Sequence, residues 1–162
     1  MTVSGGPLPD MPSISIGIVT LNSGRTLRQC LKAVFSQGYA RDKLDVFVVD
    51  AGSTDDTLAI AEDFEVSAYS EAGCTRGRAR NICIQKARAE IFVMLDSDVV
   101  IPNGWLTAAE KYFMDPEVVS VSSPYFTPEP RGGMIRRVIY YLTSGYEFHT
   151  HRALKRENWV TE

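Results

Sequence analysis

The chain has 162 residues, of which 44% are apolar and 23% charged, and these values are ordinary for one soluble globular domain with a substantial core. Its formal net charge of −3 gives no reason to expect a nucleic-acid partner. The sequence also lacks a run of about 18 apolar residues, the length needed to span a bilayer, so we expect any membrane contact to be peripheral.

Apolar runs and helical periodicities alternate along the chain after a flexible segment at 1–12. We expect strands at 14–20, 46–49, 66–69, 91–95 and 118–121, and helices at 27–35, 58–64, 77–89 and 103–113. A loop at 124–133, a helix at 134–146 and a polar tail follow. This alternation predicts an α/β fold with a mainly parallel central sheet and helices on both faces. The uniformly apolar run 91–95 is expected to be buried on both faces.

Polar residues close three of these strands. Thr20, Asp50 and Asp96 each follow a different apolar run. Right-handed crossovers bring the carboxyl ends of parallel strands to one edge, where open α/β sheets bind their ligands. Asp96 and Asp98 can hold a hard cation such as Mg²⁺ or Mn²⁺ through oxygen, and that cation could bridge the phosphates of a nucleotide.

The turn after Asp50 contains Gly52 and Ser53, which let the backbone pass close to a ligand. The Asp50 carboxylate could accept hydrogen bonds from a base imide or a ribose hydroxyl. The alternative is structural, with Asp50 or Asp55 capping the helix that follows.

Three arginines gather where the helix at 77–89 begins, namely Arg76, Arg78 and Arg80. A helix N-terminus attracts anions, and guanidinium groups match phosphate oxygens. The three cations otherwise oppose the helix dipole, which favours an anionic ligand. For Arg76 and Arg78 the alternative is a solvated basic face; for Arg80 and Asn81 we favour a functional role.

Four segments occur in an order and at spacings that are specific in combination: SISIGIVTLN at 13–22, VVDAGSTDDT at 48–57, GRARN at 77–81 and FVMLDSD at 92–98. On these segments the chain resembles the N-terminal, nucleotide-binding part of a family 2 glycosyltransferase with the Rossmann-like GT-A fold. The similarity covers roughly residues 13–106.

The resemblance implies an inverting transfer of a sugar from a nucleoside diphosphate sugar, with Mg²⁺ or Mn²⁺ as the cofactor. It places the base and ribose against the residues that match Thr20, Asn22 and Asp50, with Ser53 counted in the same nucleotide-binding group. It places Arg80 and Asn81 beside the diphosphate and the sugar. Asp96 then faces ribose and metal, and Asp98 is the firmer metal ligand, so that it acts in catalysis through the metal.

Two positions depart from the commonest family pattern. Many relatives have an aromatic residue where this chain has Leu21, and a second acid where it has Ala51. These departures leave the base of the donor open between uridine and guanosine, so a UDP- or GDP-linked sugar is expected, with a lean toward uridine.

The family's general base is not identifiable after residue 128, and an inverting displacement on a sugar hydroxyl needs one. Glu147 and Glu157 are better explained as solvated surface acids, and His149 with His151 is rejected as a metal site. The chain is therefore expected to be cut short. A lipid phosphate acceptor, already anionic, would need no strong base. In that case the basic, apolar segment 134–142 could rest on a membrane, although a core helix is the more common role for such a segment.

The expected organisation is a flexible segment at 1–12, a nucleotide-sugar-binding domain at 13–125, and the start of the acceptor side at 126–162. The acceptor, a saccharide or a lipid phosphate, stays open. Two alternatives remain: a catalytically silent donor-binding module, and an unrelated nucleotidyltransferase, although a Gly-rich phosphate loop with a following Lys is missing. Cys30, Cys74 and Cys83 lack CxxC spacing and fit a reducing compartment. We therefore expect a cytoplasmic location, with any membrane contact at the inner face.

Overall fold

The structure is a computed structural model and describes residues 11–122 and 152–155. The chain divides into two compact units, 1–107 and 108–162, which are described separately. The first unit contains the central sheet and all the residues that the sequence predicts for the site.

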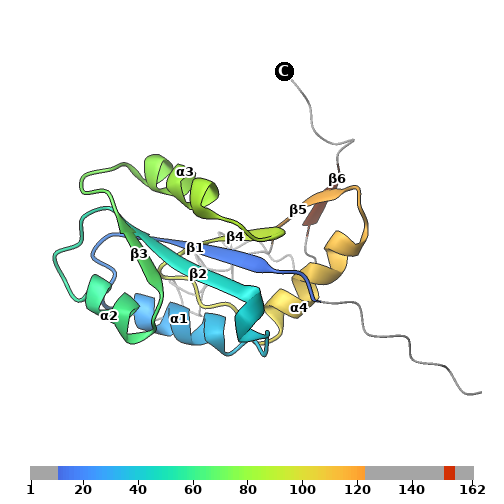
Figure 1. Ribbon diagram of the computed structural model, residues 1–162, viewed down its shortest axis with the longest axis horizontal. Helices are drawn as coiled ribbons and strands as arrows, with labels where there is room; N and C mark the ends of the chain where they lie inside the picture. The colour runs from blue at the N-terminus through green and yellow to red at the C-terminus, as the bar shows by residue number, and fades with distance from the viewer. Residues whose placement is uncertain (1–10, 123–151, 156–162) are drawn as a thin grey trace, which may run out of the picture. The chain divides into compact units, whose positions relative to one another are not determined.

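The central sheet has four parallel strands in the order β3-β2-β1-β4. They are β1 (Ile14–Thr20), β2 (Leu44–Asp50), β3 (Ser67–Ser70) and β4 (Ile91–Asp96). Helices α1 (Leu27–Phe35) and α2 (Thr57–Asp63) lie on one face of the sheet and α3 (Arg76–Lys86) on the other, as Figure 1 shows. A short 3-10 helix, η1 (Arg41–Lys43), leads into β2. The predicted α/β fold, with a parallel sheet covered on both faces, is confirmed.

The core follows from the alternation of side chains along β1 and β2, because successive residues point to opposite faces of the sheet. Ile14, Ile16 and Ile18 are buried with the apolar stripes of α1 and α2. On the other face, Phe47 and Val49 of β2 pack against α3. The buried thiols Cys30 and Cys83 belong to these two clusters, as expected for small core residues, and all three cysteines are free.

The strand register brings the predicted polar strand ends to one edge. Thr20 pairs with Asp50 across β1 and β2, and Val19 pairs with Asp96 across β1 and β4. Asp50 also pairs with Ser70 of β3. The expectation that Thr20, Asp50 and Asp96 meet at the carboxyl edge is therefore confirmed.

Two expectations about β4 and α3 are wrong. Four of the six β4 residues are apolar but only half-buried, because β4 is the edge strand of the four-stranded sheet that the described residues form. The helix expected to reach residue 89 ends at Lys86, since Ala87 has an extended ψ of 130°. The backbone N–H groups of Arg88 and Ala89 donate instead to the Ser15 hydroxyl. The Ser15 hydroxyl thus accepts the backbone hydrogen bonds of the turn between α3 and β4.

The chain leaves the sheet through α4 (Trp105–Glu110), within which the boundary between the two units falls. The second unit continues with the 3-10 helix η2 (Lys111–Met114), where a longer α-helix to residue 113 was expected. Strand β5 (Val118–Ser122) confirms the predicted strand and pairs antiparallel with β6 (Arg152–Lys155). The polar tail shows no clear period in the sequence, so strand β6 was not predicted. The predicted loop at 124–133 and helix at 134–146 lie outside the described residues.

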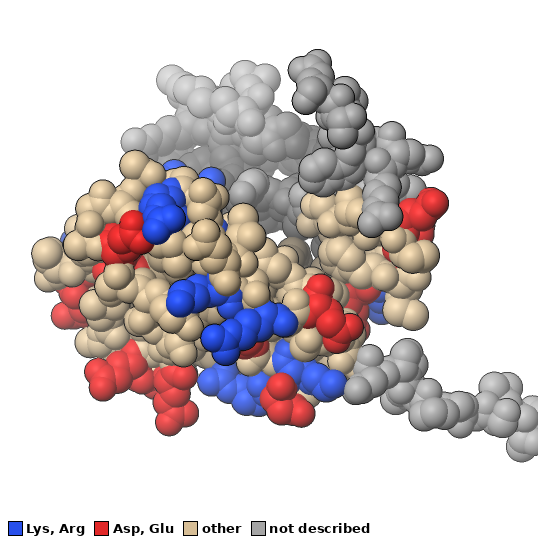
Figure 2. Space-filling model, turned by 45° about the horizontal axis from the view of Figure 1, so that its top comes forward, with Lys and Arg blue, Asp and Glu red and all other residues tan. Residues whose placement is uncertain are grey.

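Charges of both signs are interspersed on the described face drawn in Figure 2. Some of them form exposed ion pairs, such as Arg28 with Asp63 at 2.6 Å. Pairs of this kind contribute little to stability because water screens them. Among the described residues, no helix is long and apolar enough to cross a membrane.

Gly17 of β1 lies where the sheet meets α3, and it leaves no room for a side chain. A Cβ there would lie 2.9 Å from Cβ of Cys83 and 3.1 Å from Cε2 of Phe92. We expect Gly17→Ala to lower the free energy of unfolding by about 1–3 kcal/mol, the usual cost of overpacking, measured by urea denaturation. Gly77→Ala is the matched control, because its Cβ would meet no atom closer than 4.0 Å and Ala favours a helix over Gly. Equal stability of the two variants would contradict this explanation of Gly17.

Candidate functional site

Asp50 organises the turn that follows β2. Its Oδ2 accepts hydrogen bonds from the backbone N–H groups of Gly52 (3.0 Å) and Ser53 (2.8 Å). Its Oδ1 accepts from the hydroxyls of Thr20 (3.0 Å) and Ser53. Both Thr20 and Asp50 are only 1% exposed. The carboxylate is thus buried and receives four internal donors, so its structural role is clear, while contact of Thr20, Asp50 or Ser53 with a nucleotide stays a prediction.

The pKa of Asp50 reflects two opposing effects. Burial by itself would raise the pKa, but the hydrogen bonds from Ser53, Thr20 and Gly52 together outweigh it. The net result is a pKa below the ordinary value of 3.8. Asp50 is therefore a charged group that holds the edge of the sheet together.

The loop between β1 and α1 is fastened to the loop between β2 and α2. Asn22 has a left-handed backbone, with φ of 50°, and its N–H donates to the Ser53 hydroxyl at 2.8 Å. Its side-chain oxygen accepts from the N–H of Thr54 at 3.0 Å. Asn tolerates this backbone conformation better than most residues. Asn22, Ser53 and Asp50 therefore form one hydrogen-bonded group, and their contact with a base or ribose stays a prediction.

Asp55 has the capping role that the sequence left open for it or Asp50. Its Oδ1 accepts from the N–H and the hydroxyl of Thr57, the first residue of α2, and its Oδ2 accepts from the N–H of Gly24 at 2.9 Å. The hydrogen bonds from Thr57 and then Gly24 lower the pKa of this exposed carboxyl. Asp55 thus caps the N-terminal end of α2 and holds the loop before α1 in place.

The acidic motif forms a tight turn at the end of β4. The N–H of Val99 donates to the carbonyl of Asp96 at 3.0 Å, which leaves Ser97 and Asp98 as the central residues of the turn. The thiol of Cys30 also contacts the Asp96 carbonyl, with a sulfur–oxygen distance of 3.9 Å. Burial, and to a smaller extent the charge of Asp98, raises the pKa of Cys30 to about 12, so this thiol stays protonated and acts as a donor.

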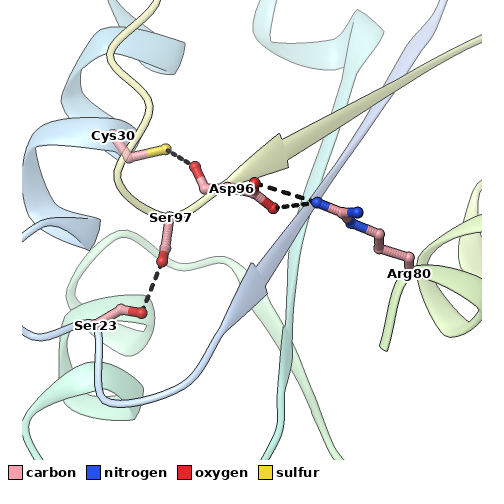
Figure 3. A network of polar contacts seen from close by, with 5 residues as sticks. All are labelled: Ser23, Cys30, Arg80, Asp96 and Ser97. Atoms are coloured by element: carbon pink, nitrogen blue, oxygen red, sulfur yellow. Dashed lines mark hydrogen bonds and ion pairs between the residues drawn. The ribbon is translucent and has the colours of Figure 1, made fainter. Parts of the chain in front are cut away.

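Arg80 approaches the Asp96 side chain from α3, on the side opposite Cys30 (Figure 3). Its Nη2 donates to both carboxylate oxygens, at 3.1 and 3.2 Å. Its Nε is buried and has no hydrogen-bond partner among the described residues. A buried donor of this kind is uncommon because it loses its hydration without replacement. The sequence predicted Arg80 and Asp96 on one site, and the structure brings them into direct contact.

The other basic residues of this region differ in their surroundings. Arg78 forms a two-pronged ion pair with Glu71, with distances of 3.0 and 3.1 Å. Arg76 and Asn81 are exposed on α3. The pairing with Glu71 gives Arg78 a local partner and so favours the solvated-face interpretation for this residue.

The oxygen donors at this edge suit a hard cation. Asp98 is exposed, and its carboxylate has no ion-pair partner among the described residues. Asp96 is half-exposed, with both oxygens engaged by Arg80. No group of three or more His, Cys, Asp or Glu side chains gathers around one point in the described part of the chain. Asp98, with Asp96 beside it, fits Mg²⁺ or Mn²⁺ provided that a bound diphosphate and water supply the remaining ligands.

The parallel sheet carries acidic residues and an arginine at its carboxyl edge, which is the edge where open α/β sheets bind their ligands. Its solved structural relatives are glycosyltransferases, and their fold is the GT-A class. The chain belongs to the family described as "Glycosyl transferase family 2", whose sequence model matches residues 15–161. The family and the glycosyltransferase class predicted from the sequence are confirmed.

Individual relatives agree with this assignment. The glycosyltransferase AglE of Haloferax volcanii is 35% identical over 103 residues, which are 59% of this chain and 34% of AglE. The mannosyltransferase PcManGT of Pyrobaculum calidifontis, solved with GDP-Man and Mn²⁺, superposes with a TM-score of 0.60 and 29% identity over 73% of this chain and 37% of that one. TarS of Staphylococcus aureus, solved with UDP-GlcNAc, gives a TM-score of 0.56 and 27% identity over 65% and 32% of the two chains. The chain thus spans about a third of AglE, of PcManGT and of the solved 1–349 part of TarS, and 19% of full-length TarS.

Several residues that shape this site were missed by sequence reasoning. Ser23 and Ser97 contact each other through their hydroxyls at 2.7 Å, although 74 positions separate them. Thr57 is fully buried and accepts a hydrogen bond from the N–H of Ser23. Thr57 was visible as part of the VVDAGSTDDT segment, but nothing in the sequence indicated the Ser23–Ser97 contact.

Proposed function

We propose that this chain forms the donor-binding part of an inverting, metal-dependent glycosyltransferase, which moves a sugar from a UDP- or GDP-linked donor to an acceptor. The observation that carries the proposal is the meeting of Thr20, Asp50 and Asp96 at one edge of the sheet, with the guanidinium of Arg80 on Asp96. Related proteins solved with UDP-GlcNAc and with GDP-Man support a nucleoside diphosphate sugar as the donor.

The base and ribose would lie along the loops that contain Asn22 and Ser53. Asp50 holds these loops in place through its hydrogen bonds to Ser53, and Thr20 donates to Asp50. Arg80 and Asn81 would face the diphosphate. The exposed position of Asn81 and the 43% exposure of the Arg80 side chain support this, because part of the guanidinium is accessible to an anionic ligand.

Asp98, with Asp96 beside it, would hold Mg²⁺ or Mn²⁺. When bound, the cation stabilises negative charge on the diphosphate as it leaves. The Mn²⁺ present with PcManGT supports a divalent cation, and the choice between the two metals stays open. In the inverting reaction an acceptor oxygen forms a bond to the anomeric carbon while the bond from that carbon to the diphosphate breaks. Arg80 would stay beside the leaving oxygen and balance its charge.

The residues named above would bind the donor, and none of them is proposed to bind or activate the acceptor. A sugar hydroxyl needs a general base within hydrogen-bond reach, whereas a lipid phosphate oxygen is already charged. TarS is named as a poly(ribitol-phosphate) β-N-acetylglucosaminyltransferase, and both acceptor classes remain open for this chain. The three free cysteines support a reducing, cytoplasmic location, and contact with the inner face of the membrane stays a prediction.

Calorimetric titration of UDP and GDP, with and without Mn²⁺, tests the proposal. We expect one of the two diphosphates to bind at least about tenfold more tightly with Mn²⁺ than without it. Metal-dependent binding without transfer or hydrolysis of the matching donor sugar would favour a silent binding module instead. Tighter binding of a nucleoside triphosphate than of a diphosphate sugar would favour a nucleotidyltransferase and contradict the proposal.

A further inference from the structure

The turn that carries the two acidic residues is tied to the loop after β1 by one pair of hydroxyls. The Oγ atoms of Ser23 and Ser97 lie 2.7 Å apart (Figure 3). Ser23 is only 8% exposed. Ser97 is half-buried, so the contact is partly shielded from water and is stronger than one on an open surface.

Ser97 is well placed to fix the direction of its neighbour Asp98. The two residues occupy the centre of the turn closed by the Val99 N–H and the Asp96 carbonyl. The backbone at Asp96 is held by its place in β4 and by the Cys30 thiol. The Ser97 side chain is therefore an additional tether on the peptide unit that carries Asp98, and Asp98 itself is exposed.

Ser23 is in turn anchored to the loop after β2. Its N–H donates to the Thr57 hydroxyl at 2.7 Å, and that hydroxyl donates to Asp55. Asp55 also accepts from the N–H of Gly24, where a Cβ would lie 2.9 Å from Oδ2 of Asp55 and so leaves no room for a side chain. A continuous series of hydrogen bonds thus runs from the loop after β2, through Ser23, to the acidic turn.

We propose that Ser23 and Ser97 are positioning residues that couple the nucleotide side of the donor site to its metal side. The inference rests on the proposed function, because it concerns the same donor site. A nucleotide that orders the loops after β1 and β2 also orders Ser23, and through Ser97 the turn that holds Asp98. Binding at each side then raises the affinity at the other by the same factor, as linkage requires.

The coupling is measured by titrating UDP or GDP, whichever the wild-type chain binds more tightly, with and without Mn²⁺. The coupling factor is the dissociation constant without Mn²⁺ divided by that with Mn²⁺. We expect Ser97→Ala to reduce this factor about fivefold, the effect of one hydrogen bond, and to change metal-free affinity less than about twofold. Ser23→Ala should reduce the coupling factor similarly, although it also removes the contacts of the Ser23 hydroxyl with the backbone N–H and carbonyl of Leu21 at 3.3 and 3.5 Å. The coupling factor of the double variant should be little lower than that of either single variant, because the Ser23–Ser97 contact is lost in all three.

Ser36→Ala is the matched control. Its hydroxyl bonds to the Ala33 carbonyl at 3.0 Å and to Asn103 at 3.2 Å, away from the acidic turn, so the coupling factor should not change. An unchanged factor in Ser97→Ala, an equal loss of affinity with and without Mn²⁺, or additive losses in the double variant would each overturn the inference. If the wild-type chain shows metal-dependent binding, such a result leaves the proposed function standing. A wild-type chain that binds neither diphosphate overturns both.

Discussion

Asp98→Ala is expected to abolish the effect of Mn²⁺ on diphosphate binding and to leave the fold intact. Asp98 is exposed beyond the end of β4, and it contributes no hydrogen bond to the sheet among the described residues. Its removal should therefore cost little stability, within about 0.5 kcal/mol. The affinity for UDP or GDP in the presence of Mn²⁺ should fall to the metal-free value, because the better placed of the two carboxylates has gone.

Calorimetry with and without Mn²⁺ measures the loss, and thermal unfolding measures the fold. Asp42→Ala is the matched control, since it removes the same charge from the 3-10 helix that precedes β2, at the opposite end of that strand from Asp50. It should leave both the affinity and its metal dependence unchanged. Metal-dependent affinity that survives in Asp98→Ala would show that the metal is held elsewhere.

Asp50→Asn is expected to destabilise the fold, in contrast to Asp98→Ala. The Asp50 carboxylate is buried and accepts four hydrogen bonds, two from backbone N–H groups and two from hydroxyls. An amide at the same place would turn its N–H₂ group toward donors and leave some of them without acceptors. We expect the free energy of unfolding at pH 7 to fall by about 2–4 kcal/mol, because hydrogen bonds to a charged group are among the stronger ones.

The pH dependence gives this variant a second readout. Since the pKa of Asp50 is lower in the folded chain than its ordinary value of 3.8, its stabilisation is fully present above that value. The stabilisation is lost as the pH falls through the folded-state pKa. The difference in stability between wild type and Asp50→Asn should therefore shrink in acid below about pH 4, measured by urea denaturation.

Asp56→Asn is the control for this variant. Asp56 is exposed at the start of α2, and its side chain makes no capping hydrogen bond, so its stability should stay within about 0.5 kcal/mol of wild type at every pH. If Asp50→Asn were as stable as the wild type, the hydrogen bonds that the Asp50 carboxylate accepts would not be what holds the turn.

The fold was predictable where the chain repeats a strong pattern. The apolar runs that form β1 and β2 end at Thr20 and Asp50, and both ends were predicted from the sequence. The half-buried state of β4 was not, because an apolar run has the same composition at the edge of a sheet as at its centre. The early end of α3 depends on Ser15, a distant residue that binds the backbone after the helix.

The sequence predicted which residues belong to the site better than it predicted how their side chains contact one another. Sequence segments placed Arg80 and Asp96 on one site, and parallel topology brings them to one edge. The direct pairing of their side chains depends on how α3 packs against the sheet, and no local pattern encodes that. The Ser23–Ser97 contact is a stronger example, because serines are common and two hydroxyls 74 positions apart leave no periodic signal. The family resemblance added the chemistry of the donor, which the residue pattern alone left open.

The most direct test uses Mn²⁺ as a paramagnetic probe in nuclear magnetic resonance of the isotopically labelled chain with bound UDP or GDP. Mn²⁺ broadens the signals of nuclei close to it. The amide signals of Thr20, Asp50, Arg80, Asp96 and Asp98 should be broadened together. The signals of Ile14, Leu44 and Ile91, which begin the same strands at the opposite edge, should stay sharp. Broadening centred on those strand beginnings, or spread evenly over the chain, would contradict a donor and metal site at the carboxyl edge.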